Sequence, residues 1–225
     1  MTKHFNRELE TIQTRLLKLF AVVEQMIHDA TRALCHREVE RAEQILVRDK
    51  TVNTEEVLIE EECLKTLALH QPVAGDLRQI ATILKINSDL ERIADLACNI
   101  GERAIGLHEY PYFPIPDRLS EMATDSTEMV RNALNAFVSQ DLDLAKQVIF
   151  NDQWVDELNR KVISEIKSVL SSDATQLEPA LHCFSASRHL ERIADHAENI
   201  AEDVIYMISG DIIRHKHGNF TINVD

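Results

Sequence analysis

The sequence has few of the residues that interrupt helices and none of the patterns that build sheets. Its 225 residues include five glycines and five prolines, well below the usual share of these two residue types. No run of alternating β-branched residues indicates a strand. We therefore expect an all-α protein, with enough chain to bury a core in one large domain or two modest ones.

Cysteine pairs and long apolar runs are also missing. The four cysteines are isolated, without a CxxC pair, and each falls in a helical pattern where a thiol packs as a small apolar group. No apolar segment approaches the roughly 18 residues that cross a membrane, and the N-terminal residues lack the apolar core of an export signal. These absences predict a cytoplasmic protein that meets a membrane only through its partners. The cysteines are Cys35, Cys63, Cys98 and Cys183.

Positive charge is in short supply. Lysine and arginine number 24 against 38 aspartates and glutamates, which gives a net charge of −14. Such a surface repels phosphate backbones, so direct binding to nucleic acid is disfavoured. Cations and basic protein surfaces are the partners that this charge favours.

Helix-breaking residues divide the chain into six predicted long helices, three on each side of a linker. Apolar residues at three- and four-residue steps mark the first helix, which ends at about His36. Gln71-Pro72 ends the second helix, and three prolines between residues 111 and 116 form the linker, because proline fixes φ and lacks a donor. The other predicted ranges are 38–69, 75–107, 118–139, 142–170 and a sixth helix from about 173, where Thr175 and Glu178 have the spacing of a capping box.

The chain also contains an internal repeat, which is the strongest pattern in it. Residues 90–95, Leu-Glu-Arg-Ile-Ala-Asp, recur as residues 190–195, and upstream matches such as Asp49 with Asp152 lie 103 positions apart. Each half is therefore one three-helix unit, and we expect two tandem three-helix bundles. The predicted boundaries are 1–109 for the first repeat, 110–117 for the linker, 118–209 for the second repeat and 210–225 for a C-terminal tail.

Acidic residues occupy matching positions in the two repeats. In an antiparallel hairpin, residues lie side by side when they are equally far from the turn. Asp49 with Asp95, and Asn53 with Glu91, are each centred on residue 72 in a loop. The second repeat shows the same symmetry, so each hairpin brings two i,i+4 pairs to one level. The predicted groups are Asp49, Asn53, Glu91 and Asp95, then Asp152, Asp156, Glu191 and Asp195.

Carboxylates gathered in this way need positive charge among them, because like charges ~4 Å apart cost on the order of 1 to 4 kcal/mol. Hard oxygen ligands suit a divalent or trivalent cation, and several carboxylates together bridge more than one ion. The alternative is ordinary ion pairing with Arg92 and Arg192, or with Arg78 and Arg188. The duplication of the groups favours metal. Whether they lie on the surface or in a half-buried seam stays open.

The same residues give the chain its resemblance to a known family. The run from Gln71 to Arg78, the two Glu-Arg-Ile-Ala-Asp segments followed by Asn-Ile, and the spacing of the acidic pairs resemble the PhoU family of phosphate-uptake regulators over essentially the whole chain. The resemblance implies a PhoU-like fold whose acidic pairs hold multinuclear metal clusters, commonly of iron, with zinc, manganese, magnesium and calcium as alternatives. Asn53 stands where a full motif has an acid, so the first site is expected to bind metal more weakly or with a different nuclearity.

The resemblance also implies partners. Proteins of this family link the phosphate ABC transporter to its sensor histidine kinase, keep phosphate-starvation genes silent when phosphate is plentiful, and are commonly homodimers. We therefore expect a regulatory adaptor that contacts the transporter ATPase and the kinase and has no catalytic residues.

Two other classes of protein are the alternatives. A ferritin-like enzyme needs Glu-x-x-His ligands, which the chain lacks, and His28-Asp29 stands without the further histidines of a metal-dependent phosphohydrolase. A metal-free helical scaffold fits the heptad steps of the fifth helix but does not explain the acidic groups. His189 and His196 flank the second motif and are expected to be solvated or at the core edge rather than metal ligands. Trp154 is expected to pack or to contact a partner.

Overall fold

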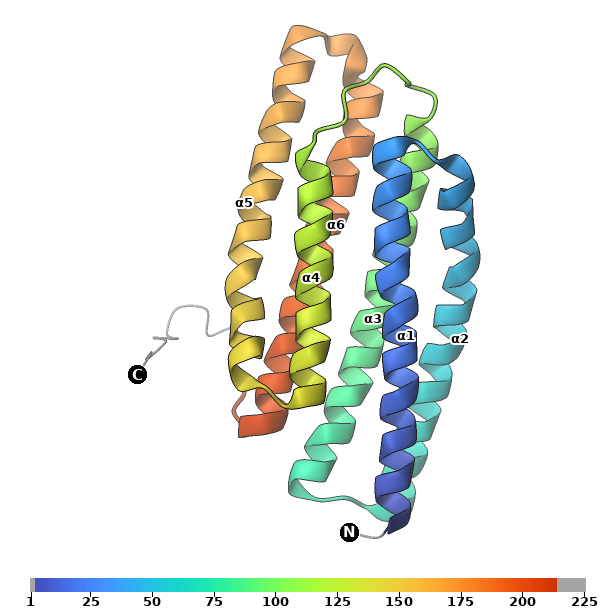
Figure 1. Ribbon diagram of the computed structural model, residues 1–225, viewed down its shortest axis with the longest axis vertical. Coiled ribbons are helices and arrows are strands. Elements are labelled where there is room, and N and C mark those ends of the chain that lie inside the picture. The colour runs from blue at the N-terminus through green and yellow to red at the C-terminus, as the bar shows by residue number, and fades with distance from the viewer. Residues whose placement is uncertain (1–2, 214–225) are drawn as a thin grey trace.

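The computed structural model describes residues 3–213, and within that range it consists of six long helices and no strand (Figure 1). The prediction of an all-α protein is confirmed, and each predicted helix boundary lies within a few residues of the observed one. The helices are α1 (Lys3–His36), α2 (Val39–His70), α3 (Ala74–Leu107), α4 (Arg118–Ser139), α5 (Leu142–Ser172) and α6 (Leu177–Ser209). Most of the predicted tail, residues 214–225, lies outside the described residues.

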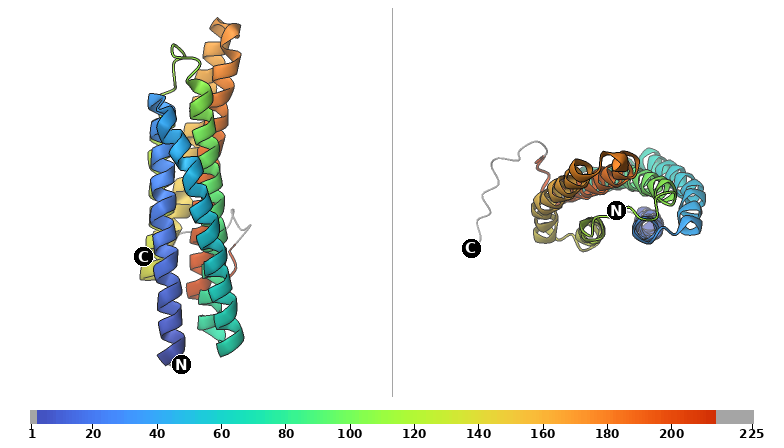
Figure 2. Two further views of the ribbon diagram at one scale, coloured as in Figure 1. Left: turned by 90° about the vertical axis from the view of Figure 1, so that its right-hand side faces the viewer. Right: turned by 90° about the horizontal axis from the view of Figure 1, so that it is seen from above.

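The helices form two tandem three-helix bundles, α1 to α3 and α4 to α6, as the internal repeat predicts. Seen end on, α5, α6, α3 and α2 follow one another along an arc, and α4 and α1 lie on its inner side (Figure 2). The two bundles pack together mainly through α3 and α6, with a smaller contact between α1 and α4. Each bundle therefore presents its α2–α3 or α5–α6 hairpin, where the acidic residues are, on the outer side of the arc.

The apolar faces of all six helices meet in one continuous core. Buried side chains from both bundles belong to the same cluster, which extends into the linker through Phe113. The guanidinium group of Arg37 donates to the Phe113 carbonyl at 2.6 Å and fixes the linker against the end of α1. The four cysteines are free thiols, buried or half-buried in the helices. Among the helices of residues 3–213, none is both long and apolar enough to cross a membrane.

The start of α6 differs from the prediction. The carboxylate of Asp173 accepts hydrogen bonds from the Thr175 backbone N–H at 3.0 Å and from the Thr175 hydroxyl. Residues Ala174–Gln176 form a short 3₁₀ turn, and the α-helix begins only at Leu177. The predicted capping box of Thr175 and Glu178 is therefore wrong. The Thr175 hydroxyl donates to the Asp173 carboxylate, and Asp173 itself is the residue that caps the 3₁₀ turn.

Polar contacts cross the seam between the two bundles. Lys85 on α3 donates to the Asp203 carboxylate on α6 at 3.0 Å, and Asp89 lies 2.9 Å from Nδ1 of His196. Nε of Arg78 donates to the Met207 carbonyl at 3.3 Å. Arg78 therefore braces one bundle against the other, and it does not take the place in an acidic group that one version of the ion-pair alternative gave it.

Asp29 holds α1 against α2 through a buried ion pair. Its side chain is 5% exposed, and its two oxygens accept from Arg41 at 2.8 Å and from Arg48 at 2.6 Å. Burial alone would raise the pKa of the Asp29 carboxyl, but the hydrogen bonds from Arg48 and Arg41 outweigh it and lower the pKa below its usual value. The acid of the His28-Asp29 pair is therefore structural, whereas His28 is exposed.

Replacing Asp29 should destabilise the protein. Asp29→Asn leaves two guanidinium groups without their carboxylate, and breaking a buried pair in this way costs about 3 kcal/mol. We expect the thermal midpoint, followed by circular dichroism, to fall by roughly 6–12 °C. The adjacent exposed substitution His28→Asn is the control, with an expected change of about 0.5 kcal/mol or less. Equal midpoints for the two variants would contradict this role.

Candidate functional site

The first predicted acidic group comes together where α2 runs back along α3. Burial raises the pKa of the Asp95 carboxyl, and the negative charge of Asp49 on the facing helix raises it further. Burial likewise raises the pKa of Glu91, with added repulsion from Asp95, Glu56 and Asp49. The amide of Asn53 donates to Oδ2 of Asp49 at 2.9 Å. Four residues from two helices therefore share one level, as the symmetry about the loop predicts.

The second group, between α5 and α6, contains four carboxyl groups, whereas the first contains three and the amide of Asn53. Burial, together with the charges of Glu198, Asp195, Asp156 and Glu191, raises the pKa of Asp152 to about 7. Burial and the charge of Asp156 also raise the pKa of Asp195. The four predicted carboxylates thus influence one another across the hairpin. The predicted groups lie in a half-buried seam, because most members are partly covered while Asn53 and Asp195 are exposed.

One member of the second group was not predicted. Burial raises the pKa of Glu198 to about 7, and the charges of Glu202, Asp195 and Asp156 contribute. The same position of the first repeat, one hundred residues earlier, is Cys98, whose thiol pKa is raised to about 12 by burial and by the charges of Asp49 and Asp95. The repeat itself carried the signal, because residues 97 and 99 match 197 and 199 on either side of this difference.

Arginines with exposed side chains contact both groups. Nε of Arg92 lies 3.5 Å from Glu91, and an Nη of the same residue lies 3.8 Å from Asp95, with the arginine side chain 61% exposed. In the second repeat Arg188 hydrogen-bonds Glu191. Ion pairs whose arginine is held mainly in solvent contribute little. The pKa values of Glu91, Asp95, Glu191 and Asp195 stay raised in spite of these arginines.

Within the predicted acidic groups, one carboxylate oxygen in each repeat is left unsatisfied. Oδ1 of Asp49 and Oε2 of Glu191 are buried and accept no hydrogen bond, which is costly for a charged group. Within residues 3–213, no three His, Cys, Asp or Glu side chains lie close enough together to hold one ion. A shared ion would therefore require side-chain rotation. The donor set itself, hard carboxylate oxygens with one orphaned oxygen in each seam, fits a hard cation.

The histidines beside the second motif have other contacts. Nδ1 of His196 pairs with Asp89 across the bundle seam at 2.9 Å, and Nε2 of His189 lies 3.1 Å from the Ser185 hydroxyl. Both rings are half-buried. Of the two expected environments, solvated or core edge, both rings have the second.

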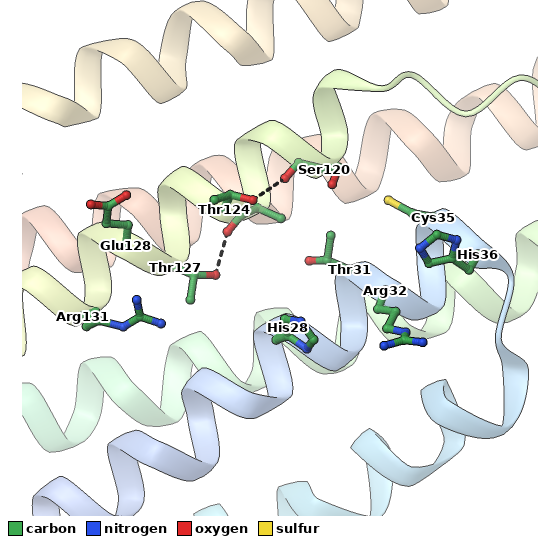
Figure 3. Close-up of a pocket in the computed structure, with 11 residues that line it drawn as sticks. His28, Thr31, Arg32, Cys35, His36, Ser120, Thr124, Thr127, Glu128 and Arg131 are labelled. Carbon is green, nitrogen blue, oxygen red and sulfur yellow. Dashed lines mark hydrogen bonds between the residues drawn. The ribbon is translucent and has the colours of Figure 1, made fainter.

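A pocket of about 440 Å³ lies away from the acidic groups, between α1 and α4 on the inner side of the arc. Figure 3 shows its lining, in which Thr31 and Cys35 come from α1 and Ser120, Thr124 and Thr127 come from α4. The hydroxyls of Thr124 and Thr127 donate to backbone carbonyls of their own helix. None of the eight predicted ligands lines this pocket.

Comparison with known proteins gives a consistent result. The family model described as the PhoU domain matches the chain twice, over residues 16–104 and 119–204. The chain is 43% identical over 211 residues to an Aquifex aeolicus protein named phosphate-specific transport system accessory protein PhoU homolog, covering 94% of this chain and 96% of that one. It is 31% identical over 215 residues to the accessory protein PhoU of Escherichia coli, covering 96% and 89%.

Solved structures resemble the fold closely. The crystal structure of PhoU from Pseudomonas aeruginosa superposes with a TM-score of 0.87 at 38% identity, covering 92% of this chain and 100% of that chain. The phosphate transport system regulatory protein PhoU from Streptococcus pneumoniae superposes with a TM-score of 0.86 at 28% identity, covering 92% and 98%.

Proposed function

Because this chain belongs to the PhoU family, we propose that it is a negative regulator of phosphate uptake and of the phosphate-starvation regulon. The observation that carries this is the match of both halves to the PhoU domain, together with relatives named as accessory proteins of phosphate-specific transport over nearly their whole length. The family is one of accessory and regulatory proteins and not of enzymes. Its members are associated with the phosphate transport system.

The finer role that we propose is that of an adaptor. In this role the chain contacts the ATPase subunit of the phosphate ABC transporter and the sensor histidine kinase of the regulon, acts in the cytoplasm and forms a homodimer. It does not bind nucleic acid, in keeping with its net charge of −14. The long helical faces of the two bundles offer extended surfaces for such contacts.

We also propose that each hairpin holds a metal cluster. The residues that would hold it are Asp49, Asn53, Glu91 and Asp95 in the first repeat and Asp152, Asp156, Glu191 and Asp195 in the second. Iron is the metal that we propose, with zinc, manganese, magnesium and calcium as alternatives. A bound cation supplies positive charge to which carboxylates of both helices bind, so that α2 is held to α3 and α5 to α6.

A metal-free scaffold is the second candidate. It is favoured by the contacts of Arg92 with Glu91 and Asp95 and by the pair of Arg188 with Glu191. Against it stand Oδ1 of Asp49 and Oε2 of Glu191, the two buried oxygens that accept no hydrogen bond from an arginine or any other group. The regulatory role holds for either candidate, and deletion of the gene in phosphate-rich medium tests it, with derepression of phosphate-starvation genes as the expected result.

A further inference from the structure

Two aromatic side chains of α5 are exposed, and one of them, Trp154, is held in place by contacts with neighbouring side chains. Phe150 is 64% exposed and Trp154, the only tryptophan, is 51% exposed. The indole Nε1 of Trp154 donates to Oδ2 of Asp125 on α4 at 3.0 Å. The ammonium group of Lys161 lies 5.1 Å from the centre of the ring. The large apolar ring therefore faces solvent while its polar edge and one face are already engaged, so little conformational entropy is lost when a partner covers it.

An acidic ridge borders this pair. Glu121, Asp125 and Glu128 follow one another along one side of α4 at spacings of four and three residues, and both glutamates are exposed. Burial and the charges of Glu121 and Glu128 raise the pKa of Asp125, although the hydrogen bond from Trp154 opposes this. The three carboxyl groups are therefore near neighbours beside an aromatic surface. We call these five residues the α4–α5 aromatic face.

The first repeat shows that the fold does not need this face. Arg118 pairs with Glu165 in the second repeat as Arg15 pairs with Glu62 in the first, and both partners are displaced by 103 positions. The α4–α5 and α1–α2 pairs of helices therefore correspond residue by residue. At the corresponding positions the first repeat has Val47 and Thr51 for the aromatic pair and Lys18, Val22 and Gln25 for the acidic ridge.

We propose that the α4–α5 aromatic face is a docking surface for a basic amphipathic helix of another protein. The apolar side of such a helix covers Phe150 and Trp154, and its lysines or arginines pair with Glu121, Asp125 and Glu128. Aromatic side chains at the centre of a contact and charges at its rim are the usual arrangement of a protein interface. The ridge repels anionic lipids, nucleic acids and acidic peptides. This inference is independent of the metal sites and of the regulatory role.

The test uses the full chain and a synthetic amphipathic helix of leucine and lysine that carries a fluorescent label. Binding is followed by the anisotropy of the label, and in the wild type also by the emission of Trp154. We expect Glu121→Gln with Glu128→Gln to weaken binding about tenfold or more. We expect a similar loss from Phe150→Val with Trp154→Thr, which restores the residues of the first repeat. Circular dichroism checks that both variants stay folded.

A matched control distinguishes binding at the α4–α5 aromatic face from general attraction of the basic peptide to the negatively charged protein. Glu40→Gln with Glu43→Gln removes two exposed carboxylates from α2 and should leave the affinity within about twofold of the wild type, because charges far from the contact are screened. Equal losses in the control and the ridge variant, or no binding at all, would overturn the proposal. The proposal would also be overturned if the wild type formed a dimer and did not bind the peptide, and Phe150→Val with Trp154→Thr dissociated that dimer. The aromatic face would then be the contact with a second copy of the chain.

Discussion

Cells that lack this chain should express alkaline phosphatase and the phosphate transporter in phosphate-rich medium at the level that wild-type cells reach during starvation. The expected change is large because, in the proposed role, the deletion removes a negative regulator completely. A plasmid copy of the wild-type gene should restore repression. Reporter activity in the deletion strain, with and without the plasmid, is the measurement. Unchanged expression in the deletion strain would contradict the regulatory role.

Complementation also separates the metal sites from the scaffold. A copy carrying Asp152→Asn, Glu191→Gln and Asp195→Asn removes three carboxylates from the second seam, and we expect it to fail to restore repression. The control carries Glu40→Gln, Glu43→Gln and Glu61→Gln, which remove three exposed carboxylates from α2, and should restore it. Immunoblots check that both proteins accumulate. Full repression by the seam variant would favour the metal-free scaffold.

The metal-free protein should lose stability as the pH rises from about 4 to about 7. The folded-state pKa values of Asp152 and Glu198 are about 7, against 3.8 and 4.5 for free groups. Between these values the folded state binds more protons than the unfolded state, so the free energy of unfolding falls with increasing pH and levels off above about 7. Both groups are partly solvated, which limits the change in thermal midpoint to a few degrees.

Thermal melts after chelator treatment, recorded across this pH range, are the measurement. Asp152→Asn should flatten the dependence, whereas Glu43→Gln on the exposed side of α2 should leave it unchanged. Added metal should raise the midpoint most near neutral pH, because the ion binds the deprotonated carboxylates and displaces their protons. Identical melts with and without metal at every pH would contradict the proposed clusters.

The extent of the helices was predictable because the breakers act locally. Pro72 and the linker prolines end or interrupt helices whatever surrounds them, and the observed boundaries follow them closely. The levels of Asp49 with Asp95 and of Asp152 with Asp195 were predictable for a different reason. A hairpin of two straight helices leaves only the position of the turn to be found, and the repeat supplied two independent examples.

Side-chain competition and contacts between elements were not predictable in this way. The cap at Asp173 was not predictable because the side chains of Asp173 and Thr175 can both bond to the backbone here, and the sequence does not show which one does so. The pairing of Arg78 with Met207 depends on how the bundles pack, which no local pattern determines. The partner of Trp154 was hidden for the same reason, because Asp125 lies on another helix.

The account depends most on the two acidic seams, and elemental analysis of protein purified without chelators tests them most directly. We predict more than one bound transition-metal ion per chain. Asp49→Asn with Glu91→Gln should remove only the metal bound by the first repeat. Asp152→Asn with Glu191→Gln should remove only the metal bound by the second. Wild-type protein that holds no metal even after reconstitution would contradict the account, and the seams would then be held by Arg92 and Arg188 alone.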